Sequence, residues 1–296
     1  MTSPVRRIWR AGEIPLAVCG REGSVLDQKP IGVFDSGLGG LTTVRELMRL
    51  LPGEDIVYFG DTGRVPYGSR SRETIVKYAR QDVAFLRTFD LKTIVIACGT
   101  VSTTAIDVLA AENDIPVLGV VEPSARRAAQ ATRNGRIGLI GTQASIRSGA
   151  YERYIEEENA GVQVLAKACP LFVPLVENGR IHPGDAVIET VCAEYLQPLK
   201  DAGVDTLVMG CTHYPLLETV IGNYMGPGVT LVNAGAEGAR AAAKLLEKTE
   251  SLAERRAGGA CRYFVSDSVQ DFSRLASLFL RRDVSEAVTQ IDIVQY

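Results

Sequence analysis

Two short segments of the chain resemble each other, and each ends in a cysteine. They run from Thr93 to Cys98 and from Thr206 to Cys211, and in both an aliphatic run suited to a buried parallel strand stops at the thiol. A thiol acts as a base in its thiolate form and as an acid when protonated. Two thiols on opposite sides of one carbon can take a proton from one face and return a proton to the other. The pair therefore indicates a reaction that inverts a carbon centre.

The chain around each cysteine predicts how its thiol is activated. Gly99 and Thr100 follow the first cysteine, and Thr212 and His213 follow the second. If a helix begins there, the partial positive charge at its N-terminus lowers the thiol pKa from the reference of about 8.5. We therefore expect both thiols to be more acidic than a free cysteine.

Nearby polar residues are candidates for binding an amino acid. Removal of an α-proton builds negative charge toward the carboxylate, so hydrogen-bond donors must be aimed there in advance. Backbone N–H groups after the cysteines and several hydroxyls are suitable donors: Ser36, Thr100, Thr142 and Thr212. Asp35 is suited to hold an ammonium group or orient a thiol, and His213 is suited to assist proton movement. Taken one at a time, Asp35 and these hydroxyls fit helix caps equally well, so the prediction depends on their joint occurrence.

Alternating strand-like and helix-like segments are expected to position these residues. Aliphatic runs predict strands at 31–34, 56–59, 93–97, 117–121, 137–140, 162–166 and 206–209. Amphipathic segments lie between them, such as 71–89, whose apolar residues fall on one helical face. This alternation predicts βα units and mostly parallel sheets flanked by helices. Ligands of such sheets bind beyond the carboxyl ends of the strands, where the candidate residues are expected to lie.

A second repeat predicts two domains. The segment Ile31 to Ser36 resembles the segment Ile137 to Thr142, at a spacing close to that of the two cysteine segments. We therefore expect two similar α/β domains, with the site in the cleft between them. The glycines at 37–40 match neither the dinucleotide fingerprint nor the phosphate loop with its lysine, so a nucleotide site is disfavoured.

Composition limits the remaining classes of function. The 296 residues are 46% hydrophobic and 23% charged, as in globular proteins, and the net charge of -3 disfavours a nucleic-acid partner. No apolar run reaches the roughly 18 residues that a membrane span needs. The six cysteines contain no CxxC pair and only two histidines accompany them, which disfavours a metal site. Residues 1–29 are expected to form a poorly ordered leader, and the protein is expected to be cytoplasmic.

The chain resembles the glutamate racemases of the aspartate/glutamate racemase superfamily. The matching motifs lie at 32–41, 61–68, 96–100, 169–179 and 210–217, and the closing strand at 263–268 is also similar. The resemblance implies an enzyme that interconverts L- and D-glutamate without a cofactor or a metal and supplies the D-isomer for peptidoglycan. It also implies a homodimer.

The same resemblance implies roles for individual residues. Cys98 and Cys211 would be the two acid/base thiols, and Asp35, Glu177 and His213 would assist catalysis. Substrate contacts would come from both halves of the chain: Asp35, Ser36, Tyr67, Gly68, Gly99, Thr100, Thr142, Thr212 and His213. The first domain would comprise 30–122 and 231–296, and the second 123–230.

One departure from the family lies in the site. The family usually has Asn after the first cysteine, whereas this chain has Gly99, which removes an amide that would bind the substrate backbone. Asn233 also begins a segment that departs from the family pattern. Two alternatives therefore stay open. One is a racemase of aspartate or another small acid, and the other is a non-catalytic, glutamate-binding regulatory protein.

Overall fold

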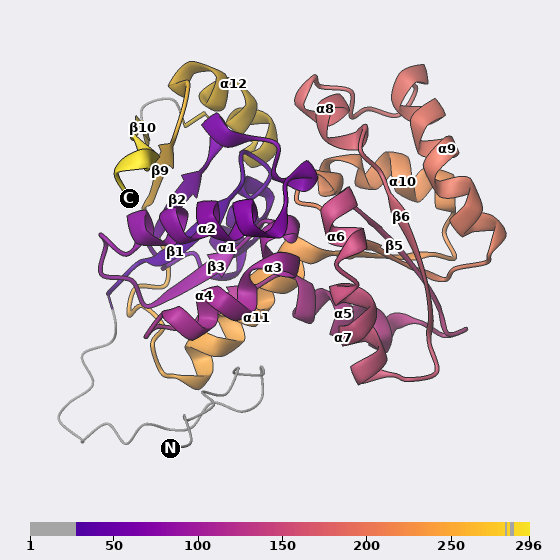
Figure 1. The fold of residues 1–296 in the computed structure, drawn as a ribbon, viewed down its shortest axis with the longest axis horizontal. Coiled ribbons are helices and arrows are strands. Elements are labelled where there is room, and N and C mark those ends of the chain that lie inside the picture. Colours follow the sequence, from indigo (N-terminus) through magenta and orange to yellow (C-terminus); the bar gives the residue numbers. More distant parts are fainter. Residues whose placement is uncertain (1–27, 282, 285–286) are drawn as a thin grey trace.

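The computed structural model describes residues 28–281, 283–284 and 287–296, so residues 1–27 of the leader predicted at 1–29 lie outside the described part. The chain forms two α/β lobes that lie side by side (Figure 1). Each lobe is built on its own parallel sheet, and helices cover the sheets. The predicted fold class, with mostly parallel sheets flanked by helices, is confirmed.

The first sheet has the strand order β10-β9-β2-β1-β3-β4. Its strands are β1 (Ile31–Asp35), β2 (Ile56–Gly60), β3 (Thr93–Ile96), β4 (Val117–Gly119), β9 (Cys261–Val265) and β10 (Val288–Gln290). Its helices are α1 (Leu41–Leu50), α2 (Arg72–Leu86), α3 (Gly99–Thr104), α4 (Ile106–Glu112) and α12 (Val269–Leu280), with short turns η1 (Thr62–Arg64), η2 (Tyr67–Ser69) and η5 (Ile293–Gln295). The central strand β1 is buried along its whole length, which is why its sequence is a continuous apolar run.

The second sheet has the order β6-β5-β7-β8. Its strands are β5 (Arg136–Gly141), β6 (Gln163–Ala168), β7 (Thr206–Met209) and β8 (Thr230–Asn233). The helices between β4 and β9 are α5 (Val121–Ala131), α6 (Gln143–Arg147), α7 (Ala150–Glu158), α8 (Phe172–Glu177), α9 (Ala186–Asp201), α10 (Glu218–Met225) and α11 (Ala234–Lys248), with the turn η3 (Tyr214–Leu217). Among the described helices, none combines the length and the apolarity needed to cross a membrane.

The two sheets repeat one arrangement. In the first, β1 lies between β2 and β3, and β3 leads to Cys98. In the second, β5 lies between β6 and β7, and β7 leads to Cys211. All eight pairings between described strands are parallel, so the two cysteine segments end at the carboxyl edges of equivalent strands. The similarity of the paired segments in sequence thus corresponds to a similarity of topology.

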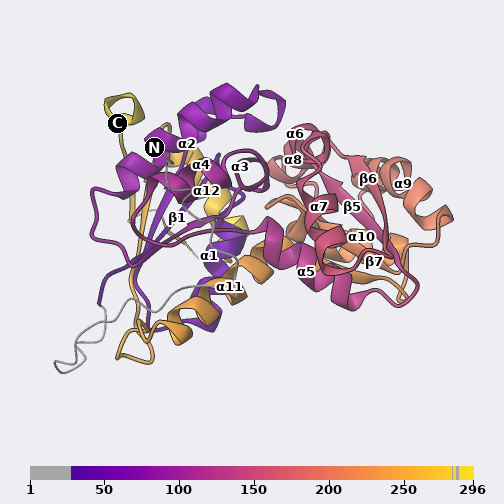
Figure 2. The same ribbon diagram turned by 60° about the horizontal axis from the view of Figure 1, so that its bottom comes forward.

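Helix α11 connects the two lobes. It leaves β8 of the second sheet and packs against α1 of the first lobe and against α5 (Figure 2). Asn233 begins this helix as its N-cap, because its side-chain oxygen accepts a hydrogen bond from the backbone N–H of Ala236. The predicted domain boundary at 230/231 stays a prediction, and strand β8 spans it.

Some predicted elements end elsewhere, and others were not predicted. The strand expected at 117–121 ends at Gly119, because Val120 and Val121 begin α5 instead. Strands β8 and β10 were not predicted from hydrophobic pattern, because they are short and only partly buried. Helix α2 lies within the predicted 71–89 and begins after Ser71, whose hydroxyl accepts from the N–H of Thr74.

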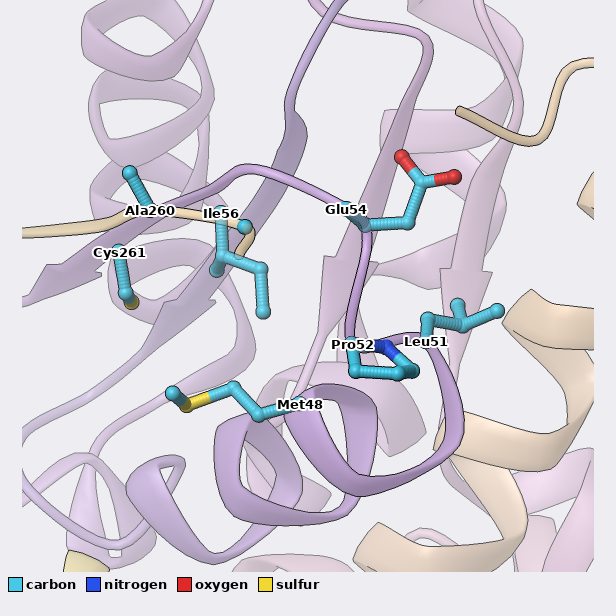
Figure 3. A pocket seen from close by; sticks show the side chains of 8 residues that line it. Met48, Leu51, Pro52, Glu54, Ile56, Ala260 and Cys261 are labelled. Atoms are coloured by element: carbon cyan, nitrogen blue, oxygen red, sulfur yellow. The ribbon is translucent and has the colours of Figure 1, made fainter. Parts of the chain in front are cut away.

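A buried ion pair stabilises the first sheet at the edge where its strands begin, opposite the carboxyl edge. Lys92 Nζ lies 2.8 Å from Glu54 Oε2, and the two side chains are 1% and 3% exposed. Lys92 also donates to the carbonyl of Ser251, and Glu54 accepts from the N–H of Ala253, so the pair fixes the chain that follows α11. Glu54 lies beside a small pocket between α1 and the start of β2 (Figure 3).

Loss of one partner should therefore destabilise the fold. Lys92→Met leaves the Glu54 carboxylate buried without its cation, and we expect the free energy of unfolding to fall by about 3 kcal/mol. Urea denaturation followed by circular dichroism measures this change. Lys29→Met removes an exposed pair with Asp90 and should cost less than about 1 kcal/mol. An equal fall in the free energy of unfolding in the two variants would contradict a stabilising role of the buried pair.

Candidate functional site

Loops from both lobes meet at the carboxyl edges of the two sheets. The Thr212 hydroxyl, after β7, lies 3.4 Å from Oδ1 of Asp35, the last residue of β1. The hydroxyls of Thr100, after β3, and Thr142, after β5, are 3.0 Å apart. These contacts join strands of different sheets, so the edges that carry the predicted residues face each other. In parallel sheets this edge is where ligands bind.

Cys98 lies at the start of α3 and is only 4% exposed. Its Sγ is 3.2 Å from the hydroxyl oxygen of Ser36. Burial, together with the negative charge of Asp35, raises the pKa of Cys98 to about 12. The predicted lowering of this pKa is therefore wrong: α3 has only six residues, and desolvation outweighs the effect of its N-terminus. Cys98 is held protonated near neutral pH, as an acid requires.

Cys211 has a different environment. Its Sγ lies 3.9 Å from Nδ1 of His213, whose Nε2 lies 2.9 Å from Oε1 of Glu177. Burial lowers the pKa of His213, but the hydrogen bonds to Cys211 and Glu177 outweigh it and raise this pKa to about 10. A protonated His213 therefore places a positive charge beside the sulfur of Cys211. The helix expected after this cysteine is absent, since only the turn η3 follows it, and His213 supplies the positive charge instead.

Asp35 connects the two lobes. It is 1% exposed, and its Oδ2 accepts from the backbone N–H of Gly37 at 3.0 Å. Burial raises the pKa of Asp35, while the charge of His213 and hydrogen bonds, including the one from Thr212, lower it. Burial has the largest effect, so the pKa of Asp35 lies above its usual value, and the side chain lies beside both cysteine loops.

The two cysteine loops touch each other through glycine. A methyl group placed on Gly99 would lie 2.4 Å from the carbonyl oxygen of Gly210 and 4.0 Å from Cα of Cys211. A methyl group on Gly39 would lie 2.1 Å from the Thr212 hydroxyl oxygen. Only residues without side chains allow such a close approach of the two lobes. The backbones that carry the two thiols are thus in direct contact.

This contact predicts a cost for any side chain at position 99. Gly99→Ala should push the Cys98 and Cys211 loops apart and lower kcat by about tenfold, because reacting groups lose their alignment. Steady-state kinetics measures the effect. Gly228→Ala is the matched control, because a methyl group there would meet no other atom within 4 Å. A fully active Gly99→Ala variant would show that the close approach is dispensable.

Several predicted contact residues have structural partners as well. Thr142 is the N-cap of α6 and accepts from the N–H of Ser145, so the helix-cap alternative holds for it, alongside its contact with Thr100. Tyr67 is buried, and its hydroxyl donates to the carboxylate of Asp61, with Asp82 a further partner at 3.2 Å. The structure thus assigns the Tyr67 hydroxyl to these carboxylates. Gly68 lies against Thr142 at the junction of the lobes.

Two further residues, one in the site and one beside it, were not predicted from the sequence. Thr42, in the first turn of α1, places its hydroxyl 2.9 Å from the carbonyl oxygens of both Gly39 and Thr212, and so ties the Cys211 loop to the first lobe. No pattern marks this threonine. Asp82 is a fully buried carboxylate on α2, and its signal was available, because it falls on the apolar face of that helix.

Among the described residues, no group of three or more histidine, cysteine, aspartate and glutamate side chains is arranged to bind a metal. The described cysteines are all free thiols: Cys98, Cys169, Cys192, Cys211 and Cys261. The site therefore offers thiols, hydroxyls, a histidine and carboxylates, which are groups for proton transfer and hydrogen bonding.

Comparison with known proteins gives a consistent result. The family model described as Asp/Glu/Hydantoin racemase matches residues 31–257. Glutamate racemase of Geobacter metallireducens is 49% identical over 252 residues, which cover 85% of this chain and 93% of that protein. Glutamate racemase of Chlorobaculum parvum is 46% identical over 259 residues, which cover 87% of this chain and 94% of that protein.

Solved structures agree in fold. The glutamate racemase isoform RacE1 of Bacillus anthracis has a TM-score of 0.86 and 37% identity over 90% of this chain and 98% of its own. The Francisella tularensis glutamate racemase, solved with D-glutamate, has a TM-score of 0.84 and 35% identity over 92% of this chain and 100% of its own. The aspartate racemase of Picrophilus torridus has a TM-score of 0.51 and 16% identity, covering 75% and 94%, which shows a shared fold alone.

Proposed function

Because the chain belongs to the Asp/Glu/Hydantoin racemase family, we propose that it is a glutamate racemase in which Cys98 and Cys211 transfer the α-proton. The observation that carries this proposal is the contact of the two cysteine loops at Gly99 and Gly210. It supports a shared site, in which an α-carbon between the thiols would present one face to each of them.

The two thiols are prepared for opposite tasks. His213 favours a thiolate at Cys211, whereas burial keeps Cys98 protonated. For the enantiomer whose α-hydrogen faces Cys211, the thiolate takes the proton and Cys98 donates its own to the opposite face. The enzyme then carries a thiol at Cys211 and a thiolate at Cys98. That form accepts the other enantiomer and runs the same steps in reverse, so the mechanism needs no cofactor.

Groups around the thiols stabilise the intermediate charge. When the α-proton leaves, negative charge spreads into the α-carboxylate, and preorganised donors lower the energy of that state. The hydroxyls of Ser36, Thr100, Thr142 and Thr212 are suited to this role, together with the backbone N–H of Gly99. Asp35 is suited to receive the substrate ammonium, because its carboxylate lies between the loops of both lobes. Glu177 acts through His213, to which it is hydrogen-bonded.

Proton exchange in deuterium oxide tests the proposal. The protein is incubated with L-glutamate, D-glutamate or L-aspartate without cofactor, and the α-proton signal is followed by NMR together with optical rotation. Loss of the α-proton and of rotation with glutamate alone is the expected result. Exchange with aspartate but not glutamate would favour the aspartate alternative. Binding of glutamate by calorimetry without exchange would favour the regulatory alternative and contradict the proposal.

The proposal extends to the setting of the enzyme. It would act in the cytoplasm as a homodimer, and its D-glutamate would serve peptidoglycan synthesis, as the resemblance to glutamate racemases implies. Light scattering on a size-exclusion column measures the mass, and a mass of one chain of 31.9 kDa would contradict the dimer.

A further inference from the structure

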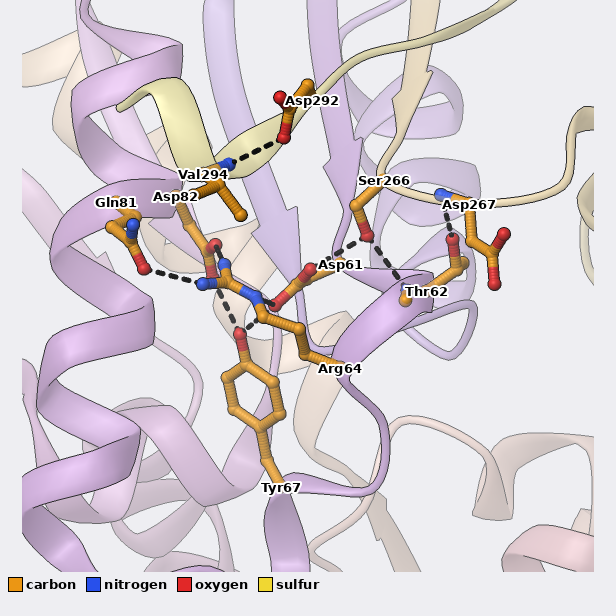
Figure 4. Close-up of polar contacts among 11 residues, drawn as sticks. Asp61, Thr62, Arg64, Tyr67, Gln81, Asp82, Ser266, Asp267, Asp292 and Val294 are labelled. Carbon is orange, nitrogen blue, oxygen red and sulfur yellow. Dashed lines mark hydrogen bonds and ion pairs between the residues drawn. The ribbon is translucent and has the colours of Figure 1, made fainter.

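A buried polar cluster lies beside the site and has no part in the proton transfer described above. We call Asp61, Arg64, Tyr67 and Asp82 the Arg64 cluster (Figure 4). The side chains of Asp61 and Asp82 are 0% exposed, and that of Arg64 is 15% exposed. The cluster joins three elements of the first lobe, since Asp61 follows β2, Asp82 lies on α2, and Ser266, after β9, donates to Asp61 at 2.8 Å.

The guanidinium of Arg64 organises the cluster. Its Nε lies 2.6 Å from Asp61 Oδ2, its Nη2 lies 2.8 Å from Asp82 Oδ1, and its Nη1 lies 2.6 Å from Gln81 Oε1. All three nitrogens are therefore engaged, in the fixed fork that only arginine provides. These bonds join the start of the loop that follows β2 to helix α2, and so they fix the loop between the two elements.

The two carboxylates differ in their hydrogen bonding. Asp61 accepts hydrogen bonds from Arg64, Tyr67 and Ser266, so it serves only as an acceptor in these contacts. Asp82 faces Arg64 with one oxygen and the Tyr67 hydroxyl with the other. Burial and the charge of Asp61 raise the pKa of Asp82 well above its usual value. A protonated Asp82 can donate to Tyr67 while Tyr67 donates to Asp61, which satisfies every group and leaves the cluster neutral.

The segment held by the cluster reaches the second lobe. Gly68 directly follows Tyr67, and a methyl group on Gly68 would lie 3.0 Å from Cβ of Thr142. Thr142 in turn contacts Thr100, two residues after Cys98. The turn η2 also packs against α6. Tyr67–Gly68 therefore lies at the junction of the two lobes, at the edge of the site.

We infer that Asp61, Arg64 and Asp82 are positioning residues that hold the Tyr67–Gly68 segment at the edge of the substrate site through the hydroxyl of Tyr67. This inference rests on the proposed function, because the segment matters only if glutamate binds beside it. The Tyr67 hydroxyl itself serves the cluster, and the substrate meets the segment that the cluster has placed.

Kinetics of cluster variants test the inference. Tyr67→Phe keeps the ring but removes the hydroxyl, and Asp61→Asn and Arg64→Met each remove one of its neighbours. Each variant is expected to raise KM for glutamate about tenfold and to change kcat by less than about threefold, because the segment binds but does not react. In the double variant Tyr67→Phe/Arg64→Met, KM should rise no further than in the single variant with the larger rise. The effects of residues in one network are not additive.

Two matched comparisons separate positioning from general stability. Asp82→Leu should raise KM, and Asp82→Asn should recover most of that loss, because an amide donates to Tyr67 and accepts from Arg64 as a protonated carboxyl does. Arg80→Met is the surface control, since Arg80 lies on the same helix as Asp82 and pairs with exposed Glu112. It should leave KM and the melting temperature unchanged.

Defined outcomes would overturn the inference. A fall in melting temperature with unchanged KM would show that the cluster is merely structural. Additive increases of KM in the double variant, or equal increases of KM in Asp82→Asn and Asp82→Leu, would show the same. Calorimetric binding of D-glutamate distinguishes this failure from failure of the proposed function. If the wild type binds without racemising, the proposed function is wrong, and the same pattern in Kd then supports or overturns the positioning role. A wild type that neither binds nor racemises glutamate contradicts both.

Discussion

Replacing either Cys98 or Cys211 with alanine is expected to lower racemisation of glutamate by about 1000-fold or more, because one face of the α-carbon loses its proton carrier. L- and D-glutamate have equal free energies in solution, so the ratio of their kcat/KM values must stay at one. Damage to either thiol therefore slows both directions equally. Polarimetry from both enantiomers, with circular dichroism as a check on folding, measures this result.

Isotope exchange should reveal the separate task of each thiol. In deuterium oxide the remaining thiol can still remove a proton from its own face and return a deuteron there without inversion. Cys98→Ala is thus expected to exchange the α-proton of one enantiomer, and Cys211→Ala that of the other. Cys261→Ala is the matched control, because Cys261 begins β9 at the opposite edge of the first sheet and should leave activity intact. Exchange of both enantiomers by one single-thiol variant would rule out the assignment.

Replacing His213 with asparagine is expected to lower kcat by about 100-fold near pH 8, because Cys211 loses the neighbouring cation that stabilises its thiolate. Kinetics at several pH values measures the effect, and wild-type activity should decline as pH rises through about 10, where His213 loses its proton. His182→Asn is the matched control, since His182 is exposed and outside the site. An unchanged kcat in His213→Asn would show that Cys211 needs no such partner.

The same histidine links stability to pH with a definite sign. Its pKa is raised from 6.5 to about 10 in the folded protein, so the folded state holds a proton that the unfolded state releases earlier. The stabilisation is fully present below about pH 6.5 and is lost as pH rises through about 10. The wild type should therefore lose its stability advantage over His213→Asn between these values, as denaturant unfolding at each pH would show. A constant difference would contradict the raised pKa.

The sequence by itself determined the sheet architecture and the residues at its carboxyl edge. Apolar runs and helical periodicity depend on residues close together in the chain, so they predicted strands β1 to β3 and β5 to β7 and helix α2. The repeat of the cysteine segments also predicted two thiols at equivalent strand ends. Motif resemblance added Glu177, which pattern alone would leave as a solvated surface carboxylate.

Only the tertiary structure decided how these residues are tuned. The pKa of Cys98 follows from burial and from Asp35, which is distant in the chain, so a local argument from the helix terminus gave the wrong direction. The partners of the Tyr67 hydroxyl come from the loop after β2 and from α2, and the approach of Gly99 to Gly210 joins loops of the two sheets. Desolvation and Coulomb interactions depend on distance in space, which local sequence patterns do not contain.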